Sequence, residues 1–329
     1  MRGDNKVRKP NLFIVGAGRS GTTALHAFLK QHPDIFMSDP KELWYFCLDL
    51  KQEVRDYCRK NGGFSRVPDF YKSLTEKDYL KFFAGWKSEK VAGESTPAYL
   101  HSKVAARKIH KFNPEAKIII MLRNPVDWMY SVHAHNVHAG RESAINFEKA
   151  LELEKERRRG NLLPKKVFSP SSFFYSQRAS FAYQVKRYYD LFDKKQIKVI
   201  IFDDFEKDNA GIYREVLEFL GVDPNFTPKF KKINANKKPK FTGLLVFFKA
   251  PFFTKISELP MGTLPQPLAL KYKKFRNFIF GSIFNREQPR PSMDSELRRK
   301  LMKKFKPEVE RLGKILNRDL TGLWGYDTV

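Results

Sequence analysis

Residues 16–23, with the sequence GAGRSGTT, have the composition of a phosphate-binding loop. Gly16 and Gly21 enclose four residues, and Thr22 stands where a nucleotide-triphosphate-binding loop carries its lysine. Glycines between a strand and a helix let backbone N–H groups approach an anion, and the positive end of the helix dipole adds to the attraction. The sequence therefore predicts a phosphate site in which Arg19 is the only cation of the loop.

A second anion site is predicted from Arg123 and Ser131. Arg123 follows the apolar run KIIIML, and Ser131 comes eight residues later, within a predicted helix. A bidentate guanidinium together with a hydroxyl suits a dianionic phosphate. The spacing alone also fits a surface arginine beside an ordinary helix serine, but its place after a buried strand and downstream of the first loop favours the anion site. The stretch NKKPK, residues 236–240, is either a loop over the same ligand or a solvated loop.

The segment GAGRSGTTAL, followed by HPDI and KELWYF, resembles the 5′-phosphosulfate-binding segment of the sulfotransferases. These enzymes transfer a sulfuryl group from 3′-phosphoadenosine 5′-phosphosulfate (PAPS) to an acceptor and leave adenosine 3′,5′-bisphosphate (PAP). The resemblance implies that two sets of residues hold the donor, the phosphosulfate by Gly18, Arg19, Ser20, Gly21, Thr22 and Thr23, and the 3′-phosphate by Arg123 and Ser131. It also explains the missing lysine, because PAPS has no β- or γ-phosphate and its transfer in this family needs no metal.

Many sulfotransferases carry lysine where this chain has Arg19. Arginine is a poor acid, so the bridging oxygen is expected to be stabilised differently here. The resemblance is specific over residues 11–46 and 117–132, looser over 93–100, 197–205 and 291–324, and absent over most of 223–290. The members of the family that the chain resembles are the carbohydrate, heparan-sulfate-type and bacterial sulfotransferases.

The resemblance to carbohydrate sulfotransferases implies that Glu42 is the general base for the acceptor hydroxyl. Adjacent Lys41 is expected to orient the donor or the acceptor, while Trp44 and Tyr45 shape the acceptor pocket. Glu94 lies in GESTPAYL, which resembles a recurring Gly-Glu-x-x-Pro-x-Tyr segment. Two interpretations of Glu94 stay open, a contact with the acceptor and a structural carboxylate at a strand end.

Histidine is the competing base, because sulfotransferases of small molecules use one. His101 follows the GESTPAYL segment and could approach the site. His133, His135 and His138 share the predicted helix of Ser131, but positions i and i+2 face different ways. No metal site is expected, because these histidines lack a supporting carboxylate.

Strands that alternate with helices must position these residues. Short β-rich or apolar runs predict strands over residues 12–18, 90–95, 117–122 and 197–205. Helical spacing of apolar residues predicts helices over residues 22–32, 125–140, 172–192 and 211–222. This order predicts an α/β fold, a P-loop-like doubly wound and mainly parallel sheet flanked by helices, with ligands beyond the carboxyl ends of its strands.

The 329 residues, 42% of them hydrophobic, fit a single sulfotransferase domain. Its predicted parts are an α/β core over 11–222, an irregular C-terminal lobe rich in basic and aromatic residues over 223–292, and C-terminal helices over 293–329. One of these helices is expected to begin at Asp294 and another at Pro307.

The charge balance, 62 Lys and Arg against 36 Asp and Glu, gives a net charge of +26 and predicts an anionic partner. The two cysteines indicate reduced thiols rather than a disulfide framework, and no apolar run is long enough for a signal peptide or a spanning helix. A cytoplasmic location is expected. Peripheral membrane contact through residues 241–284 is an open alternative.

The function predicted on this basis is PAPS-dependent O-sulfation of a glycan, glycolipid or small alcohol or phenol. One alternative is a P-loop kinase, for which VIIFD at 199–203 could pass as a magnesium-binding strand end, but Thr22 in place of lysine disfavours it. The other alternative is a non-catalytic protein that binds membranes or polyanions. Nucleic acid is not expected as a partner, because the lysines are dispersed and no binding motif is present.

Overall fold

The computed structural model describes residues 8–61, 74–164, 169–230, 237–238, 286–287 and 292–329. The chain divides into two compact units, one of residues 1–231 with 293–329 and the other of residues 232–292. In the second unit, β6 (Lys237–Lys238) pairs antiparallel with β7 (Arg286–Glu287). The rest of the predicted NKKPK loop and the whole of 241–284 lie outside the described residues.

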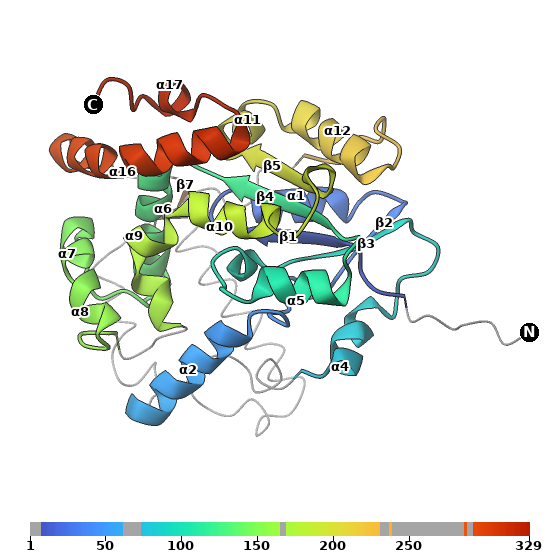
Figure 1. The fold of residues 1–329 in the computed structure, drawn as a ribbon, viewed down its shortest axis with the longest axis horizontal. Coiled ribbons are helices and arrows are strands. Elements are labelled where there is room, and N and C mark those ends of the chain that lie inside the picture. Colours follow the sequence, from blue (N-terminus) through green and yellow to red (C-terminus); the bar gives the residue numbers. More distant parts are fainter. Residues whose placement is uncertain (1–7, 62–73, 165–168, 231–236, 239–285, 288–291) are drawn as a thin grey trace, which may run out of the picture. The chain divides into compact units, whose positions relative to one another are not determined.

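The first unit is built on a five-stranded parallel sheet with the order β2-β3-β1-β4-β5 (Figure 1). The strands are β1 (Leu12–Gly16), β2 (Ile35–Met37), β3 (Val91–Ser95), β4 (Lys117–Leu122) and β5 (Ile197–Ile201). From β1 the chain first builds one side of the sheet and then crosses to the other side, so β1 is the point where the strand order reverses. This parallel sheet confirms the predicted fold class. Open α/β sheets bind ligands at the point where the strand order reverses, so a ligand is expected at the end of β1.

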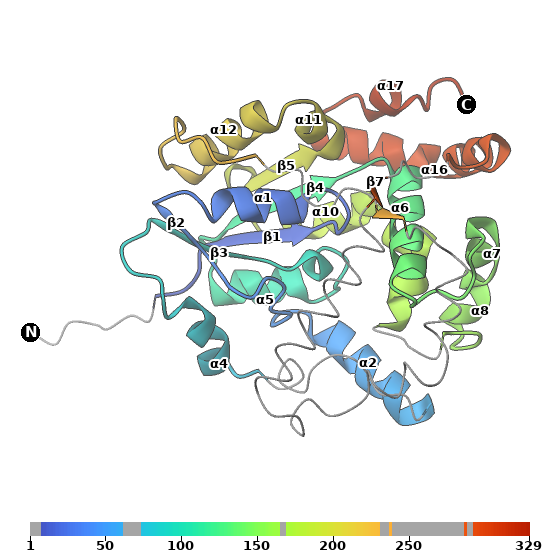
Figure 2. The ribbon, with the colours of Figure 1, turned by 180° about the vertical axis from the view of Figure 1, so that it is seen from behind.

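Helices cover both faces of this sheet (Figures 1 and 2). One face carries α1 (Thr22–Leu29), α11 (Phe202–Lys207) and α12 (Asn209–Leu220), and the other carries α5 (Ala105–Phe112) and α10 (Phe181–Tyr189). The remaining helices in the described ranges are α2 (Leu48–Asn61), α4 (Glu76–Leu80), α6 (Pro125–His138), α7 (Phe147–Glu152), α8 (Glu154–Arg158), α9 (Tyr175–Arg178), α16 (Ser295–Leu316) and α17 (Leu320–Trp324). Short 3-10 helices lie at Lys81–Phe83, Pro97–Tyr99, Pro170–Phe173 and Lys194–Gln196. No described helix has the length and apolar composition that crossing a membrane would require.

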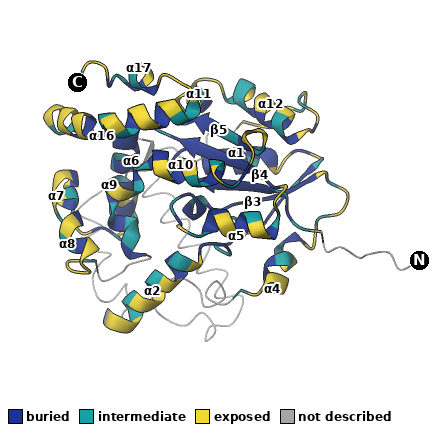
Figure 3. Cartoon of the chain, in the orientation of Figure 1, coloured by how far each residue is buried: buried dark blue, intermediate teal, exposed yellow. Residues whose placement is uncertain are grey.

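Aromatic side chains pack the two faces of the sheet. On one face, the Phe28 ring of α1 lies 6.2 Å from the Phe205 ring of α11 and 6.4 Å from the Tyr213 ring of α12. On the other, the Phe46 ring lies 5.7 Å from Phe13 of β1 and 5.2 Å from Phe112 of α5. The strands are buried while the helices expose their outer sides (Figure 3). Apolar burial from two sides therefore fixes the strand ends that carry the site.

Two predicted helices differ from the structure. The predicted helix over 172–192 is interrupted between α9 and α10, because Ser180 has a non-helical backbone and the Glu308 carboxylate of α16 accepts a hydrogen bond from the Ala182 amide at 2.7 Å. The prediction that Pro307 begins a separate helix is wrong, since α16 is one helix with Pro307 inside it. Buried Phe305 and Val309 on either side of the proline keep α16 packed on the rest of the first unit.

The strand predictions differ at two places. β5 ends at Ile201, and residues 202–207 are helical, so the predicted strand over 197–205 is too long. β2 was missed because it contains only three residues, too few for a periodic pattern.

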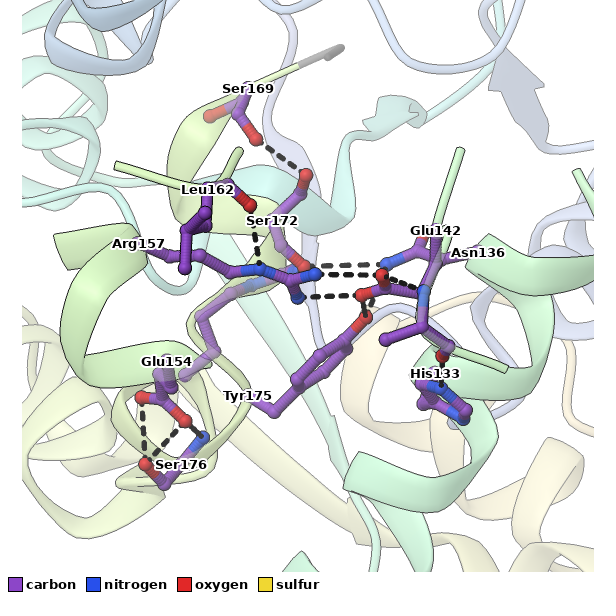
Figure 4. Close-up of polar contacts among 12 residues, drawn as sticks. His133, Asn136, Glu142, Glu154, Arg157, Leu162, Ser169, Ser172, Tyr175 and Ser176 are labelled. Atoms are coloured by element: carbon purple, nitrogen blue, oxygen red, sulfur yellow. Dashed lines mark hydrogen bonds and ion pairs between the residues drawn. The ribbon is translucent and has the colours of Figure 1, made fainter. Parts of the chain in front are cut away.

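A buried ion pair fixes α6 to α8 and α9 (Figure 4). The Arg157 guanidinium donates to both oxygens of Glu142 at 2.7 and 2.8 Å, and neither side chain is exposed. The Tyr175 hydroxyl donates to the same carboxylate at 2.8 Å and accepts from Asn136 of α6 at 3.4 Å. Since α6 also carries Ser131, this network helps to set the position of a predicted site residue.

Glu142→Gln is expected to lower the free energy of unfolding by about 3–5 kcal/mol, because it leaves the Arg157 charge buried without a counter-charge. The matched control is Glu152→Gln, which breaks an exposed pair with Lys149 and should cost less than about 1 kcal/mol. Urea denaturation followed by circular dichroism measures both values. Equal losses in the two variants would contradict a stabilising role for the buried pair.

Candidate active site

The predicted phosphate loop follows β1 and is held against β4 and α6. The Trp128 indole N–H of α6 donates to the Gly18 carbonyl at 2.6 Å. Gly21 has a left-handed backbone with φ of 91°, and a Cβ there would lie 3.0 Å from Met121 Cε and 3.1 Å from Phe205 Cδ1. Backbone angle and space therefore both favour glycine at this position.

The loop presents hydrogen-bond donors that have no acceptor among the described residues. Gly21 is the N-cap residue of α1 and supplies no side-chain hydrogen bond to the first turn of the helix. Within the part of the chain that the structure describes, the amides of Thr22 and Thr23 donate to no carbonyl, and the buried hydroxyl of Ser20 has no hydrogen-bond partner. Free amides at a helix start together with an unpaired buried hydroxyl suit the oxygens of a phosphate or sulfate group.

The second predicted anion site adjoins this loop. Arg19, with a left-handed φ of 68°, donates from Nε to the Ser131 hydroxyl of α6 at 3.4 Å. Burial and the nearby charge of Arg123 lower the pKa of Arg19. The Arg123 guanidinium stacks on Phe202, 4.6 Å from its ring centre. The structure thus brings Arg19, Arg123 and Ser131 together at one edge of the sheet.

Neither of these guanidinium groups has a carboxylate partner among the described residues. Two like charges that are partly buried and close together are unfavourable without an anion between or beside them. This edge of the sheet therefore favours a ligand with more than one negative group.

Lys41 and Glu42 lie beside the end of β3, the neighbour of β1. The Glu42 amide donates to the Ser95 carbonyl at 3.1 Å, and the Lys41 ammonium lies 3.1 Å from the Glu42 carboxylate. The Glu42 side chain is 44% exposed, so its carboxylate is accessible to a ligand.

The two aromatic residues predicted for the acceptor pocket follow directly. Tyr45 stacks on Tyr79, with ring centres 4.4 Å apart and an angle of 13° between the planes, and Trp44 is partly buried against the same core. Both residues belong to the same short segment as Glu42.

Glu94 is fully buried and surrounded by hydroxyl groups. Its carboxylate accepts hydrogen bonds from Thr96 at 2.6 Å, Tyr79 at 2.8 Å and Tyr99 at 3.0 Å. Burial raises the pKa of Glu94, and these three donors oppose the rise. Burial argues against a contact with an acceptor and favours the structural interpretation of this residue.

Burial lowers the pKa of two of the predicted rival bases, His101 and His135. Burial, with the charges of Arg178 and Arg187, lowers the pKa of His101 well below its usual value. Burial and the charge of Arg19 lower the pKa of His135 to about 4. His133 shares a hydrogen bond of 2.8 Å with the Ala144 carbonyl. No group of three metal-ligating side chains occurs in the described ranges.

Two residues of this site were missed by sequence reasoning. Phe202 follows β5, and Arg123 follows the neighbouring parallel strand β4. Because the carboxyl ends of parallel strands lie at the same edge of the sheet, the sequence held a signal that Phe202 would contact Arg123. Trp128 lies one helical turn before Ser131, but its contact with Gly18 depends on how α6 packs, which no local pattern shows.

Comparisons with known proteins give the family of the chain and a solved structure with a similar fold. The model of the family described as "Sulfotransferase family" matches residues 10–228. Among solved structures, a sulfotransferase from Alicyclobacillus acidocaldarius is similar with a TM-score of 0.68 and 29% identity, over 96% of this chain and 99% of that chain.

Two curated proteins are similar over parts of their length. Human "Bifunctional heparan sulfate N-deacetylase/N-sulfotransferase 3" is 26% identical over 226 residues, which are 67% of this chain and 23% of that protein. "Membrane-associated sulfotransferase kil1" of Dictyostelium discoideum is 29% identical over 118 residues, which are 36% of this chain and 21% of that protein. The chain thus spans less than a quarter of either relative.

Gly21→Ala is expected to lower the free energy of unfolding by about 2–4 kcal/mol, because its Cβ meets Met121 and Phe205 and its φ is positive. Gly140→Ala is the matched control, since Gly140 also has a positive φ but has no atom within 4 Å of the added Cβ. The control should lose only about 1 kcal/mol. If thermal or urea unfolding shows equal losses, the loop is not packed as described.

Proposed function

The chain belongs to the sulfotransferase family, and on this premise we propose that it transfers the sulfuryl group of PAPS to an acceptor hydroxyl. The observation that carries the proposal is the contact between Arg19 and Ser131. It joins the amide loop after β1 to the segment after β4, so that one ligand with two anionic ends can reach both. PAPS has a phosphosulfate and a 3′-phosphate on one adenosine.

The donor-binding residues divide between these two ends. The free amides of Thr22 and Thr23, the hydroxyl of Ser20 and the Arg19 guanidinium supply donors for the phosphosulfate. Arg123 and Ser131 supply a guanidinium and a hydroxyl for the 3′-phosphate. Thr22 in place of a loop lysine is no loss in this arrangement, because there is no γ-phosphate to neutralise.

The proposed reaction is an in-line displacement at sulfur. A bond forms between the acceptor oxygen and sulfur, and the bond from sulfur to the bridging phosphate oxygen breaks. Glu42 takes the acceptor proton, since its carboxylate is exposed and lies beside the end of β3. Lys41 pairs with Glu42, while Arg19 and the loop amides stabilise the charge that develops on the leaving phosphate. No residue in this scheme calls for a metal.

The acceptor is proposed to be a hydroxyl of a glycan, a glycolipid or a small alcohol or phenol. Trp44 and Tyr45 are proposed to contact it, because they lie in the segment that carries Glu42. The names of the curated relatives include enzymes of heparan sulfate, an anionic glycan, which is in keeping with the charge of +26. Cytoplasmic location and membrane contact through 241–284 stay predictions.

The kinase alternative loses its candidate magnesium ligand. The two aspartates after β5 lie in α11, where the Asp203 carboxylate accepts from the Trp324 indole at 3.2 Å and Asp204 pairs with Arg318. In the described contacts, both carboxylates are therefore engaged with the C-terminal segment, Asp203 with α17 and Asp204 with the turn before it.

Titration calorimetry tests the donor assignment. We expect adenosine 3′,5′-bisphosphate to bind at least ten-fold more tightly than ATP, because only the bisphosphate places a phosphate at Arg123 and Ser131; a charge-assisted contact of this kind contributes roughly 1.5–3 kcal/mol. Tighter binding of ATP would support the kinase alternative, and binding of neither would support a non-catalytic protein.

Glu42→Gln is expected to lower transfer from labelled PAPS by about 100-fold or more while leaving the affinity for the bisphosphate unchanged, since the amide cannot accept the proton. An acceptor screen with hydroxyl compounds and labelled PAPS provides the assay. Glu310→Gln, an exposed carboxylate of α16, is the control and should transfer at the wild-type rate. Full transfer by Glu42→Gln would reject Glu42 as the base.

A further inference from the structure

We propose that Glu94 is a positioning residue, which orients two hydroxyl groups so that they hold the backbone of residues 42–46 and thereby place the Glu42 carboxylate. This inference rests on the proposed function, because the role of Glu42 belongs to it. The observation behind it is the arrangement of consecutive amides around the end of β3.

The amides of this segment lie against residues of the GESTPAY stretch. The Glu42 amide donates to the Ser95 carbonyl at 3.1 Å, and the Leu43 amide opposes the rise in the pKa of Glu94. The Trp44 amide reaches the Thr96 hydroxyl at 3.5 Å. The Tyr45 and Phe46 amides share the Tyr99 hydroxyl, at 3.0 and 3.4 Å.

The buried carboxylate decides how these hydroxyls point. A hydroxyl has one proton to donate and two lone pairs that accept. Thr96 and Tyr99 direct their protons at Glu94, at 2.6 and 3.0 Å, so their lone pairs face the amides of residues 44–46. Without the carboxylate, each proton is free to rotate toward another acceptor, and the amides lose an oriented partner.

The segment needs this support because its backbone is strained. Glu42 and Trp44 are non-glycine residues with left-handed φ values of 68° and 58°. Such residues persist only where the surroundings hold them. Among the described residues, the Glu42 side chain forms an ion pair with its neighbour Lys41 only, so the backbone rather than a distant side chain sets its place. Relaxation of the segment would therefore move the carboxylate.

Tyr79 offers a matched comparison with Tyr99. Both tyrosines are fully buried, and both donate to the same Glu94 oxygen, Oε1, at 2.8 and 3.0 Å. The Tyr99 hydroxyl also accepts from the amides of the segment, whereas the Tyr79 hydroxyl contacts the carboxylate alone among the described contacts. Removing either hydroxyl costs one buried hydrogen bond to Glu94. Only the loss of the Tyr99 hydroxyl also releases the amides of Tyr45 and Phe46.

We therefore expect Tyr99→Phe to lower kcat for sulfuryl transfer about 10–100-fold with little change in the affinity for adenosine 3′,5′-bisphosphate, since a small displacement of a catalytic group has an effect of this size. Tyr79→Phe should stay within about three-fold of the wild-type kcat. Glu94→Gln should resemble Tyr99→Phe. Equal effects of the two tyrosine variants on kcat would overturn the proposal.

Amide hydrogen exchange of the full chain separates this inference from the proposed function. Tyr99→Phe should accelerate exchange at Tyr45 and Phe46, and Tyr79→Phe should leave it unchanged. If the wild-type protein transfers no sulfuryl group from labelled PAPS, the proposed function fails, while exchange still decides whether the hydroxyl holds the segment. Unchanged exchange in Tyr99→Phe would contradict the claim that the Tyr99 hydroxyl holds the backbone of this segment.

Thr96→Val is a second variant in case Tyr99→Phe fails to fold. It keeps the shape of the side chain, removes the hydroxyl between Glu94 and the Trp44 amide, and should also lower kcat and accelerate exchange at Trp44. Wild-type kcat and exchange in a folded Thr96→Val would contradict the proposal.

Discussion

The contact between Arg19 and Ser131 is the interaction on which the site depends, because it joins two segments that are more than a hundred residues apart. It exists only if β1 and β4 lie side by side in parallel, so that the loop after one and the helix after the other meet at the same edge of the sheet. Topology thus places two cationic, hydroxyl-bearing segments within reach of one ligand. Arg19 and Arg123 have no carboxylate partner among the described residues, so their charges are available to that ligand.

The protein fixes this edge through groups that do not touch a ligand themselves. Trp128 ties the Gly18 carbonyl to α6, and the buried pair of Arg157 and Glu142 ties the far end of α6 to α8 and α9. On the other side of β1, Glu94 and its hydroxyls hold the segment of Glu42 against β3. Buried polar groups that are fully hydrogen-bonded have a defined geometry, which suits them to positioning. The donor segments and the proposed base therefore rest on separate supports.

Much of this arrangement could be predicted from sequence, because its signals are local. The alternation of strands with helices predicted the parallel sheet, which the structure confirms. The glycine loop after an apolar run and the arginine after KIIIML predicted two anion-binding segments, and the structure brings these two segments together. What sequence could not show depends on packing between distant residues: the Glu308 side chain that interrupts 172–192, the continuous α16 through Pro307, and the burial of Glu94. A carboxylate at a strand end has the same local pattern whether it meets an acceptor or three hydroxyls, so both interpretations of Glu94 had to stay open. The assignment of the site residues to their roles still rests on the proposed function.

The central claim is that the loop of Arg19 and the segment of Arg123 bind the two ends of one adenosine nucleotide. It is tested most directly by calorimetry of Arg19→Ala and Arg123→Ala with two ligands, adenosine 3′,5′-bisphosphate and adenosine 5′-monophosphate. The account predicts that Arg123→Ala weakens binding of the bisphosphate by about ten-fold or more and leaves the monophosphate unchanged, while Arg19→Ala weakens both. Equal weakening of both ligands by Arg123→Ala, or of neither, would contradict it.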